Sequence, residues 1–124
     1  VAAAHAGWRG LAAGVLEATL DAMQVPPGEV MVWMGAAIGP DAFEVGSEVR
    51  DTFVAHHPQS IMAFTPHRQK WLADITTLAR IRLNACGVTA VYGGGLCTYT
   101  DAERFYSYRR DGKTGRMASL IWLA

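Results

Sequence analysis

The chain alternates between short, wholly apolar runs and longer stretches in which apolar positions recur every three or four residues. The first pattern is typical of buried strands and the second of helices with one apolar face. Residues 70–87 show the clearest helical period, and residues 11–24 carry a similar stripe that ends before a Pro-Pro pair. Residues 47–57 are predicted to form a third helix with Ser47 as its N-cap, and Gly87 fits a C-terminal stop.

The remaining segments predict strands, loops and a hairpin. The runs expected to be strands are residues 1–5, 29–35, 88–95, 96–100, 105–110 and 116–123. Residues 35–46 are expected to be a loop, and residues 58–70 an irregular segment with one short strand. Asp111-Gly112 predicts a hairpin turn. Strands alternating with helices before a β-hairpin place the chain in the α/β (α+β) class, as a layered domain.

Composition narrows the class of protein. A length of 124 residues with 51% hydrophobic residues suits one folded domain and excludes a disordered chain. A formal net charge of zero gives no electrostatic reason to expect nucleic acid or an anionic membrane as a partner. The apolar runs are shorter than the roughly 20 residues that span a bilayer. Two cysteines without a Cys-x-x-Cys pair favour a reduced, cytoplasmic setting.

The segment whose side chains are best suited to catalysis or ligand binding lies near the start of the chain. His5 follows a predicted strand and precedes a glycine-containing turn and a helix, a position where functional side chains often gather. An imidazole there can bind a metal or act as an acid or base, although spacing alone favours a core histidine bonded to a carbonyl. Arg9 beside a helix start suits phosphate or carboxylate, or else a surface ion pair. Trp8 is interpreted as a packing residue.

Two further stretches could bind a ligand. The loop from Gly35 through Ile38 to Gly39 could turn backbone N–H groups towards an anion, but it matches no phosphate-loop pattern, and an ordinary turn is the better explanation of these residues alone. Arg109 lies in a run of aromatic residues and arginines that could stack a base and hold phosphate. An alternating strand, with Arg109 and Arg110 on opposite faces, is the simpler explanation of that run.

The other candidate residues give weaker signals. Cys97 follows a glycine run and could be a nucleophile or a ligand, but a free cysteine is usually a small buried hydrophobe. Cys86 is a weaker candidate at a helix end. His56 and His57 point about 100° apart on a helix and are expected to be solvated. His67 lies in a polar segment that favours neither role.

Four stretches taken together resemble a known family. They are HAGWRGL at 5–11, GAAIGPDAFEVG at 35–46, CTYT at 97–100 and FYSYRRDGKTGRMASLIWL at 105–123. In this order they resemble the C-terminal half of the bacterial laccase-domain proteins, a family called polyphenol oxidase and also described as purine nucleoside phosphorylase with adenosine deaminase activity. The resemblance covers essentially the whole chain. It implies an α/β/β/α sandwich with mixed sheets, of which residues 1–124 would be the C-terminal portion of a single domain.

The resemblance also implies a metal site. The family has zinc held by two histidines and one cysteine, and His5 corresponds to the second histidine. The other two ligands are expected upstream of Val1, and Cys97 belongs to a different motif. Because a catalytic zinc site needs three protein ligands, we expect this chain alone to be inactive. Ala36 stands where the family loop usually has a proline, which we expect to loosen the loop.

The function implied is zinc-dependent phosphorolysis of a purine nucleoside (adenosine, inosine, guanosine or methylthioadenosine), with adenosine deaminase activity. Arg9 and the loop from Gly35 to Gly39 are plausible phosphate elements, and Arg109 is a further substrate-binding candidate. One alternative is a copper-dependent polyphenol oxidase, but a multicopper centre needs several His-x-His pairs and this chain has four histidines and no such pair. A second alternative is a non-catalytic fragment that only binds or folds.

Overall fold

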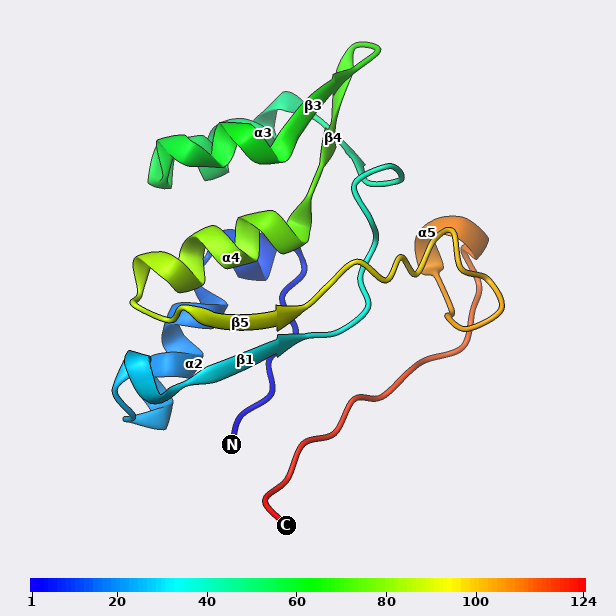
Figure 1. The fold of residues 1–124 in the computed structure, drawn as a ribbon. Helices are drawn as coiled ribbons and strands as arrows, with labels where there is room; N and C mark the ends of the chain where they lie inside the picture. Colours follow the sequence, from blue (N-terminus) through cyan, green and yellow to red (C-terminus); the bar gives the residue numbers. More distant parts are fainter.

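Two small sheets organise the chain, and helices pack against them (Figure 1). The computed structural model describes residues 1–124. In chain order the elements are α1 (Trp8–Ala12), α2 (Val15–Met23), the 3-10 helix η1 (Pro27–Glu29), β1 (Met31–Met34), β2 (Glu44–Val45), α3 (Ser47–His56), the 3-10 helix η2 (Pro58–Ala63), β3 (Phe64–His67), β4 (Lys70–Ala73), α4 (Ile75–Ala85), β5 (Ala90–Gly93) and α5 (Tyr108–Asp111). One sheet is parallel and the other antiparallel, and with the helices they confirm the predicted α/β (α+β) class.

The parallel sheet consists of β1 and β5, with Met31 opposite Ala90 and Trp33 opposite Tyr92. Side chains alternate between the faces of a strand. One face of this sheet packs against a small core cluster that includes Leu83 of α4, with leucines of α2 alongside. The other face carries exposed side chains. No helix of the structure is both long and apolar enough to cross a bilayer.

The antiparallel sheet has the order β2-β4-β3 and borders the main core. Strands β3 and β4 form a hairpin whose turn contains Arg68 at a φ of 56°. Phe53 on α3 is the largest side chain that is almost completely buried, and its ring centroid lies 6.4 Å from that of Phe64 on β3. The expected irregular segment therefore contains a short helix and an ordered strand.

Three consecutive glycines begin at Gly93, the last residue of β5, and Gly93 is the one whose replacement would meet the paired strand. Gly93 has a φ of 78°, a region that other residues rarely adopt. A Cβ at Gly93 would overlap the carbonyl oxygen of Met34 and would lie 2.9 Å from Nε1 of Trp33. Gly93 thus lets β1 and β5 stay close where the parallel pairing ends.

The predicted strands at the two ends of the chain are absent. Residues 1–5 and 116–123 are exposed and pair with no strand. Their apolar composition predicted burial, but a strand forms only beside a partner that takes up its backbone hydrogen bonds. No neighbouring strand in this chain supplies those bonds.

Local hydrogen bonds explain two further differences between the predicted and the observed elements. Residues 70–73 form β4 and not the first turn of a helix, because Asp74 caps α4 and fixes its start at Ile75. Residues 105–110 are not a strand: the Ser107 hydroxyl accepts a hydrogen bond from the Arg110 amide and begins α5. Residues 96–100 make only an isolated bridge, and no hairpin forms at 111–115.

The other helix boundaries were predicted more closely. Residues 11–24 are helical but break at Gly14, whose φ of 95° separates α1 from α2. Helix α3 begins at Ser47, but its N-cap is Gly46, and no side chain caps it. The predicted stop at Gly87 is confirmed by a φ of 89° directly after α4.

Asp74 gives a testable contribution to stability. Its Oδ1 accepts the Thr77 amide at 3.0 Å, and both carboxylate oxygens accept threonine hydroxyls. Burial by itself would raise the pKa of Asp74, but hydrogen bonds from Thr77 and Thr76 outweigh it and hold the pKa below its ordinary value. We expect Asp74→Ala to lower the free energy of unfolding by about 1 kcal/mol at neutral pH.

The sign of the pH dependence follows from that lowered pKa. The charged cap stabilises the fold fully above the ordinary aspartate pKa of about 4 and loses this contribution as pH falls through the folded-state value. Urea unfolding of wild type and Asp74→Ala should therefore converge at acid pH. Asp74→Asn is the control, since it keeps a capping oxygen without a titrating charge. A gap between wild type and Asp74→Ala that widened on acidification would contradict this explanation.

Candidate functional site

The loop at residues 35–46 is held against the segment that follows the glycine run. The Ala37 amide donates to the Leu96 carbonyl at 3.1 Å, and the Thr98 amide donates to the Ala37 carbonyl at 2.9 Å. The Gly39 amide donates to Sγ of Cys97 at 3.1 Å. These contacts join two stretches that lie far apart in sequence and fix the loop on both sides of Ile38.

Cys97 has an environment that favours its thiolate. Burial by itself would raise the pKa of the Cys97 thiol, but hydrogen bonds from Thr100, Gly39 and Tyr99 outweigh it, so the pKa lies below its ordinary value. A Cβ at Gly39 would lie 3.1 Å from Sγ, so glycine also allows this close approach. Cys97 is therefore half-buried and hydrogen-bonded. It is not the fully buried hydrophobe that is usual for a free cysteine.

The same contacts decide which loop amides are free. The amides of Ala37 and Gly39 already have acceptors within the chain. The amides of Ala36 and Ile38 donate to no group of the protein. The Gly35 amide is free as well, so an anion bound between Gly35 and Gly39 would be held by the amides of Gly35, Ala36 or Ile38 and not by those of Ala37 and Gly39. A sequence pattern cannot reveal this, because it depends on contacts made 58 residues away.

His5, Trp8 and Arg9 lie around the start of α1. His5 is exposed in extended chain, and Trp8 is half-buried against the main core cluster, which confirms its packing role. The Arg9 guanidinium lies 4.5 Å from the centroid of the Trp8 ring and is exposed. No carboxylate pairs with Arg9, so its charge is available to a ligand.

The residues of this chain do not by themselves fit a zinc ion. His5 supplies one imidazole, and no three histidine, cysteine, aspartate or glutamate side chains lie close enough together to hold a metal. Tetrahedral zinc with an open position needs three protein ligands. Cys97 belongs to the loop contacts described above.

Arg109 points towards the start of β2 and the residue before it. Its Nη1 donates to the Glu44 carbonyl at 3.3 Å, and its guanidinium lies 5.5 Å from the centroid of the Phe43 ring. The side chain remains exposed, and its remaining N–H groups have no partner in the chain. Arg109 is thus attached to the same loop that carries Ile38.

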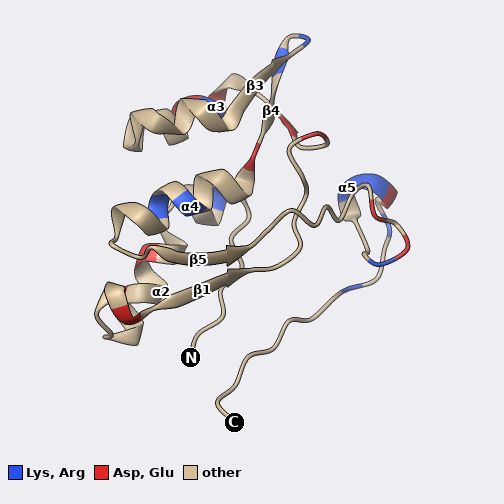
Figure 2. Ribbon diagram, viewed as in Figure 1, with Lys and Arg blue, Asp and Glu red and all other residues tan.

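Arg110, its neighbour, has a structural role that the sequence analysis missed. Its guanidinium donates to the carbonyls of Thr98, Tyr99 and Phe105 at 2.9–3.1 Å and pairs with both Asp111 oxygens. The pKa of Asp111 falls below its ordinary value because Arg110 hydrogen-bonds to it. Arg110 therefore folds residues 98–111 into a compact turn (Figure 2, where blue and red meet at α5).

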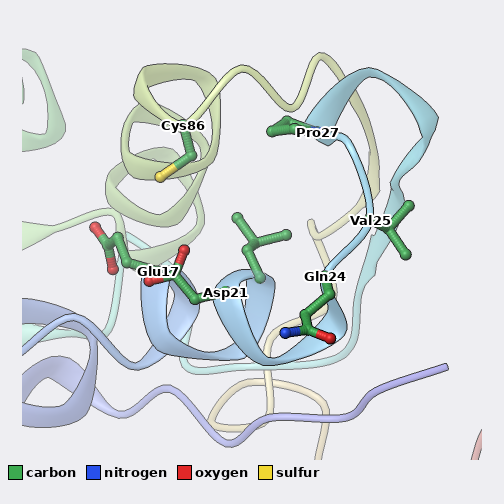
Figure 3. Close-up of a pocket in the computed structure, with 7 residues that line it drawn as sticks. Glu17, Asp21, Gln24, Val25, Pro27 and Cys86 are labelled. Atoms are coloured by element: carbon green, nitrogen blue, oxygen red, sulfur yellow. The ribbon is translucent and has the colours of Figure 1, made fainter.

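The remaining candidates lie apart from these residues. The rings of His56 and His67 contact the Thr52 carbonyl at 3.0 Å and the Glu44 carboxylate at 3.6 Å, respectively. His56 is exposed, as predicted, whereas His57 is half-buried. Cys86 lines a shallow cavity of about 240 Å³ with Glu17 and Asp21 (Figure 3). Burial and these two negative charges raise the pKa of the Cys86 thiol, which disfavours its thiolate.

One core cluster supports all the candidate binding elements. Ala6 and Trp8, beside His5 and Arg9, pack against the same cluster as Ala37 and Ile38 of the loop. Phe43, under Arg109, is a buried member of that cluster. An imidazole, two arginines without a carboxylate partner and the free loop amides therefore belong to segments that pack against the same cluster. Such a set of donors suits an anionic ligand.

The chain is similar in sequence to curated bacterial proteins. A purine nucleoside phosphorylase of Pseudomonas aeruginosa, PA4543, is 66% identical over 99% of this chain and 52% of its own length. The Escherichia coli purine nucleoside phosphorylase YfiH is 58% identical over 99% of this chain and 51% of its own length. This chain therefore spans about half the length of the relatives it matches.

Solved structures show the same fold. The crystal structure of Neisseria meningitidis protein NMB0706 matches with a TM-score of 0.85 and 53% identity over 88% of this chain and 46% of its own. That of YlmD from Geobacillus stearothermophilus matches with a TM-score of 0.80 and 30% identity over 88% of this chain and 43% of its own. The family model described as multi-copper polyphenol oxidoreductase laccase matches residues 1–124. The chain belongs to this laccase family.

Proposed function

We propose that this chain forms the phosphate-binding part of a purine nucleoside phosphorylase. The observation that carries the proposal is the joint placement of Arg9, Arg109 and the free amides of Ala36 and Ile38 on one core cluster. The names of the P. aeruginosa and E. coli relatives support the same activity. In phosphorolysis a phosphate oxygen bonds to C1′ of the ribose, the bond from C1′ to the base breaks, and the base leaves with a proton.

Each group has a role in that reaction. Arg9 would hold phosphate by charge and by its fork of N–H donors, which is a strong combination for an oxyanion. The Ala36 and Ile38 amides would orient the phosphate for attack, with Gly35 and Gly39 shaping the loop around them. Arg109 would hold a second oxygen of the phosphate or ribose. The two free cysteines fit a reducing compartment such as the cytoplasm.

Arg9→Ala tests the phosphate role. The enzyme to use is a chimera in which this chain replaces the matching half of the P. aeruginosa relative, because the chain spans 52% of that protein. We expect the KM for phosphate to rise about tenfold or more, since a charged hydrogen bond contributes about 1.5–3 kcal/mol. The KM for inosine should change less. Arg104→Ala is the matched control, because Arg104 is exposed and pairs with Asp101.

An unchanged phosphate dependence in Arg9→Ala, with inosine phosphorolysis intact, would remove Arg9 from the proposal. A chimera that oxidises phenols with copper and leaves inosine unchanged would favour the polyphenol oxidase alternative, which the family description keeps open. Adenosine deamination is a separate arm of the same assay.

We further propose that His5 is one zinc ligand of the complete site, with the other ligands supplied from outside this chain. The 124-residue chain alone should then bind zinc weakly and show no turnover. Zinc titration by calorimetry checks this, with His5→Ala expected to remove what binding there is and His56→Ala, at an exposed helix end, to leave it unchanged. Stoichiometric, tight zinc in the isolated chain would contradict the proposal.

A further inference from the structure

Helix α5, which carries Arg109, is too short to hold itself in place. It spans Tyr108–Asp111, and isolated helices much longer than that are only marginally stable in water. Figure 1 shows α5 apart from the other helices, so packing against another helix does not supply the missing support. Its own bonds are the Ser107 cap and two backbone bonds, donated by the amides of Asp111 and Gly112. The place of Arg109 must therefore be fixed by contacts outside the helix.

Arg110 supplies the attachment of α5 to the rest of the chain. Its Nη1 donates to the carbonyls of Thr98 and Tyr99 at 2.9 and 3.0 Å, and its Nη2 donates to the Phe105 carbonyl at 3.1 Å. Its Nε and Nη2 also donate to the two carboxylate oxygens of Asp111. These five bonds account for all five N–H donors of a guanidinium. Arg110 thus joins α5 to the segment after Cys97 and keeps no donor for a ligand.

The same segment is bonded to the loop at residues 35–46. The Thr98 amide donates to the Ala37 carbonyl at 2.9 Å, and the Gly39 amide donates to Sγ of Cys97 at 3.1 Å. None of these bonds involves Arg110, so the loop keeps its shape without that side chain. Residues 97–99 therefore connect the loop on one side to α5 on the other, and the second connection is made by Arg110.

Arg109 has only a weak tether of its own to the loop. Its Nη1 donates to the Glu44 carbonyl at 3.3 Å, which is longer than a typical N–H···O bond. Its guanidinium also lies 5.5 Å from the centroid of the Phe43 ring. One long hydrogen bond at the surface does not offset the freedom that a long side chain loses when it is ordered. Without Arg110, therefore, Arg109 would not keep one position beside the loop.

We propose that Arg110 is a positioning residue, which holds Arg109 in a fixed place relative to the free amides of Ala36 and Ile38. This role rests on the proposed function, because phosphate is the ligand that Arg109 and the amides would share. A donor that is already held in place loses less freedom when it binds, so its contribution to phosphate affinity is larger. Arg110 acts on phosphate only through Arg109, since its own donors are all engaged within the chain.

A double-mutant cycle in phosphate affinity tests the proposal, with the chimera described above. Arg110→Met should raise the KM for inorganic phosphate about three- to tenfold, the usual cost of ordering a long side chain on binding. The kcat and the KM for inosine should change less than about twofold. Arg110→Lys should behave like Arg110→Met, because lysine keeps the charge but cannot make the five bonds. In an Arg109→Ala background, Arg110→Met should raise the phosphate KM no further.

Hydrogen exchange checks the position of α5 without any activity. In Arg110→Met the amides of Asp111 and Gly112 should exchange faster than in wild type. Those of Ala37 and Thr98 should stay protected, because their acceptors lie outside α5.

Arg104→Met is the matched control. Arg104 lies in the same turn and also pairs with an aspartate, Asp101, but its side chain donates to no carbonyl. The same substitution there should leave the phosphate KM and the exchange of α5 unchanged.

Four results would overturn the proposal. They are a wild-type phosphate KM in Arg110→Met, a wild-type phosphate KM in Arg110→Lys, an equal effect of Arg110→Met with and without Arg109, and α5 amides that stay protected in Arg110→Met. A lower kcat with an unchanged phosphate KM falls under the first result and indicates a structural role alone. A chimera without phosphorolysis would count against the proposed function. Phosphate binding by calorimetry to the same variants would then decide the role of Arg110, with binding that does not depend on Arg110 overturning it.

Discussion

Replacing Glu17 by alanine is expected to lower the free energy of unfolding by about 3–5 kcal/mol. Glu17 on α2 accepts a hydrogen bond from Nε of Arg82 on α4 at 2.7 Å. The Arg82 side chain is only 7% exposed, whereas that of Glu17 is 30% exposed. Removing the carboxylate would leave a guanidinium buried without a counter-charge, and it could reach water only by opening the contact between the helices.

Because Arg82 is more deeply buried than Glu17, replacing Arg82 provides a control for Glu17→Ala. Arg82→Met should be milder than Glu17→Ala, because Glu17 can be hydrated when it loses its partner. The pair is also incompletely satisfied, since Oε2 of Glu17 and Nη1 of Arg82 are buried without partners. The double variant Glu17→Ala with Arg82→Met should therefore be more stable than Glu17→Ala alone.

Urea unfolding of the four proteins completes a double-mutant cycle. Cys86 offers an independent measurement, because burial raises the pKa of its thiol and the charge of Glu17 adds to that rise. In a folded Glu17 variant the rate of Cys86 alkylation should rise at a given pH. Additive effects of the two substitutions on stability would show that the ion pair contributes nothing.

The second large effect is expected at Gly93. Gly93→Ala should lower the free energy of unfolding by about 3 kcal/mol or more, through a left-handed backbone and steric overlap together. The overlap is with the carbonyl oxygen of Met34, which belongs to the paired strand and cannot move without breaking the pairing.

Gly95 is a closely matched control for Gly93. Its φ of 79° is nearly the same, but a Cβ there would meet nothing within 4 Å. Gly95→Ala should therefore show the conformational effect alone, about 1–2 kcal/mol. Thermal and urea unfolding of the two variants separate the contributions. Equal destabilisation by both would mean that β1 and β5 do not approach each other as closely as described.

Elements with their own internal signals were predictable from the sequence. The stripe in residues 11–24, the run before Gly35 and the glycines after β5 each mark an element that the structure contains. Helix α4 was predicted in the right place, but with β4 added to its start. Asp74 is of a residue type that favours N-caps, so the sequence does carry a signal for this boundary.

The failures have two physical sources. Residues 1–5 and 116–123 have the composition of strands, and pairing depends on a partner that composition does not describe. Residues 105–110 have β-prone side chains, but Ser107 and Arg110 make local hydrogen bonds that favour a short helix. For the candidate site, the sequence indicated His5, Arg9, the loop and Arg109. Which loop amides are free follows from contacts with Leu96 and Cys97, which only the fold reveals.

Arg109 and Arg110, neighbours on α5, together contribute the effective charge of a single arginine. Arg110 forms an ion pair with Asp111 and donates hydrogen bonds to three carbonyls. The carboxylate of Asp111 therefore cancels most of the electric field of the Arg110 charge. Arg109 has no acidic partner and keeps its full charge next to the Glu44 carbonyl. The electrostatic attraction that an approaching anion feels at α5 therefore comes from Arg109. Raising the ionic strength should screen that one charge while leaving the turn built by Arg110 in place.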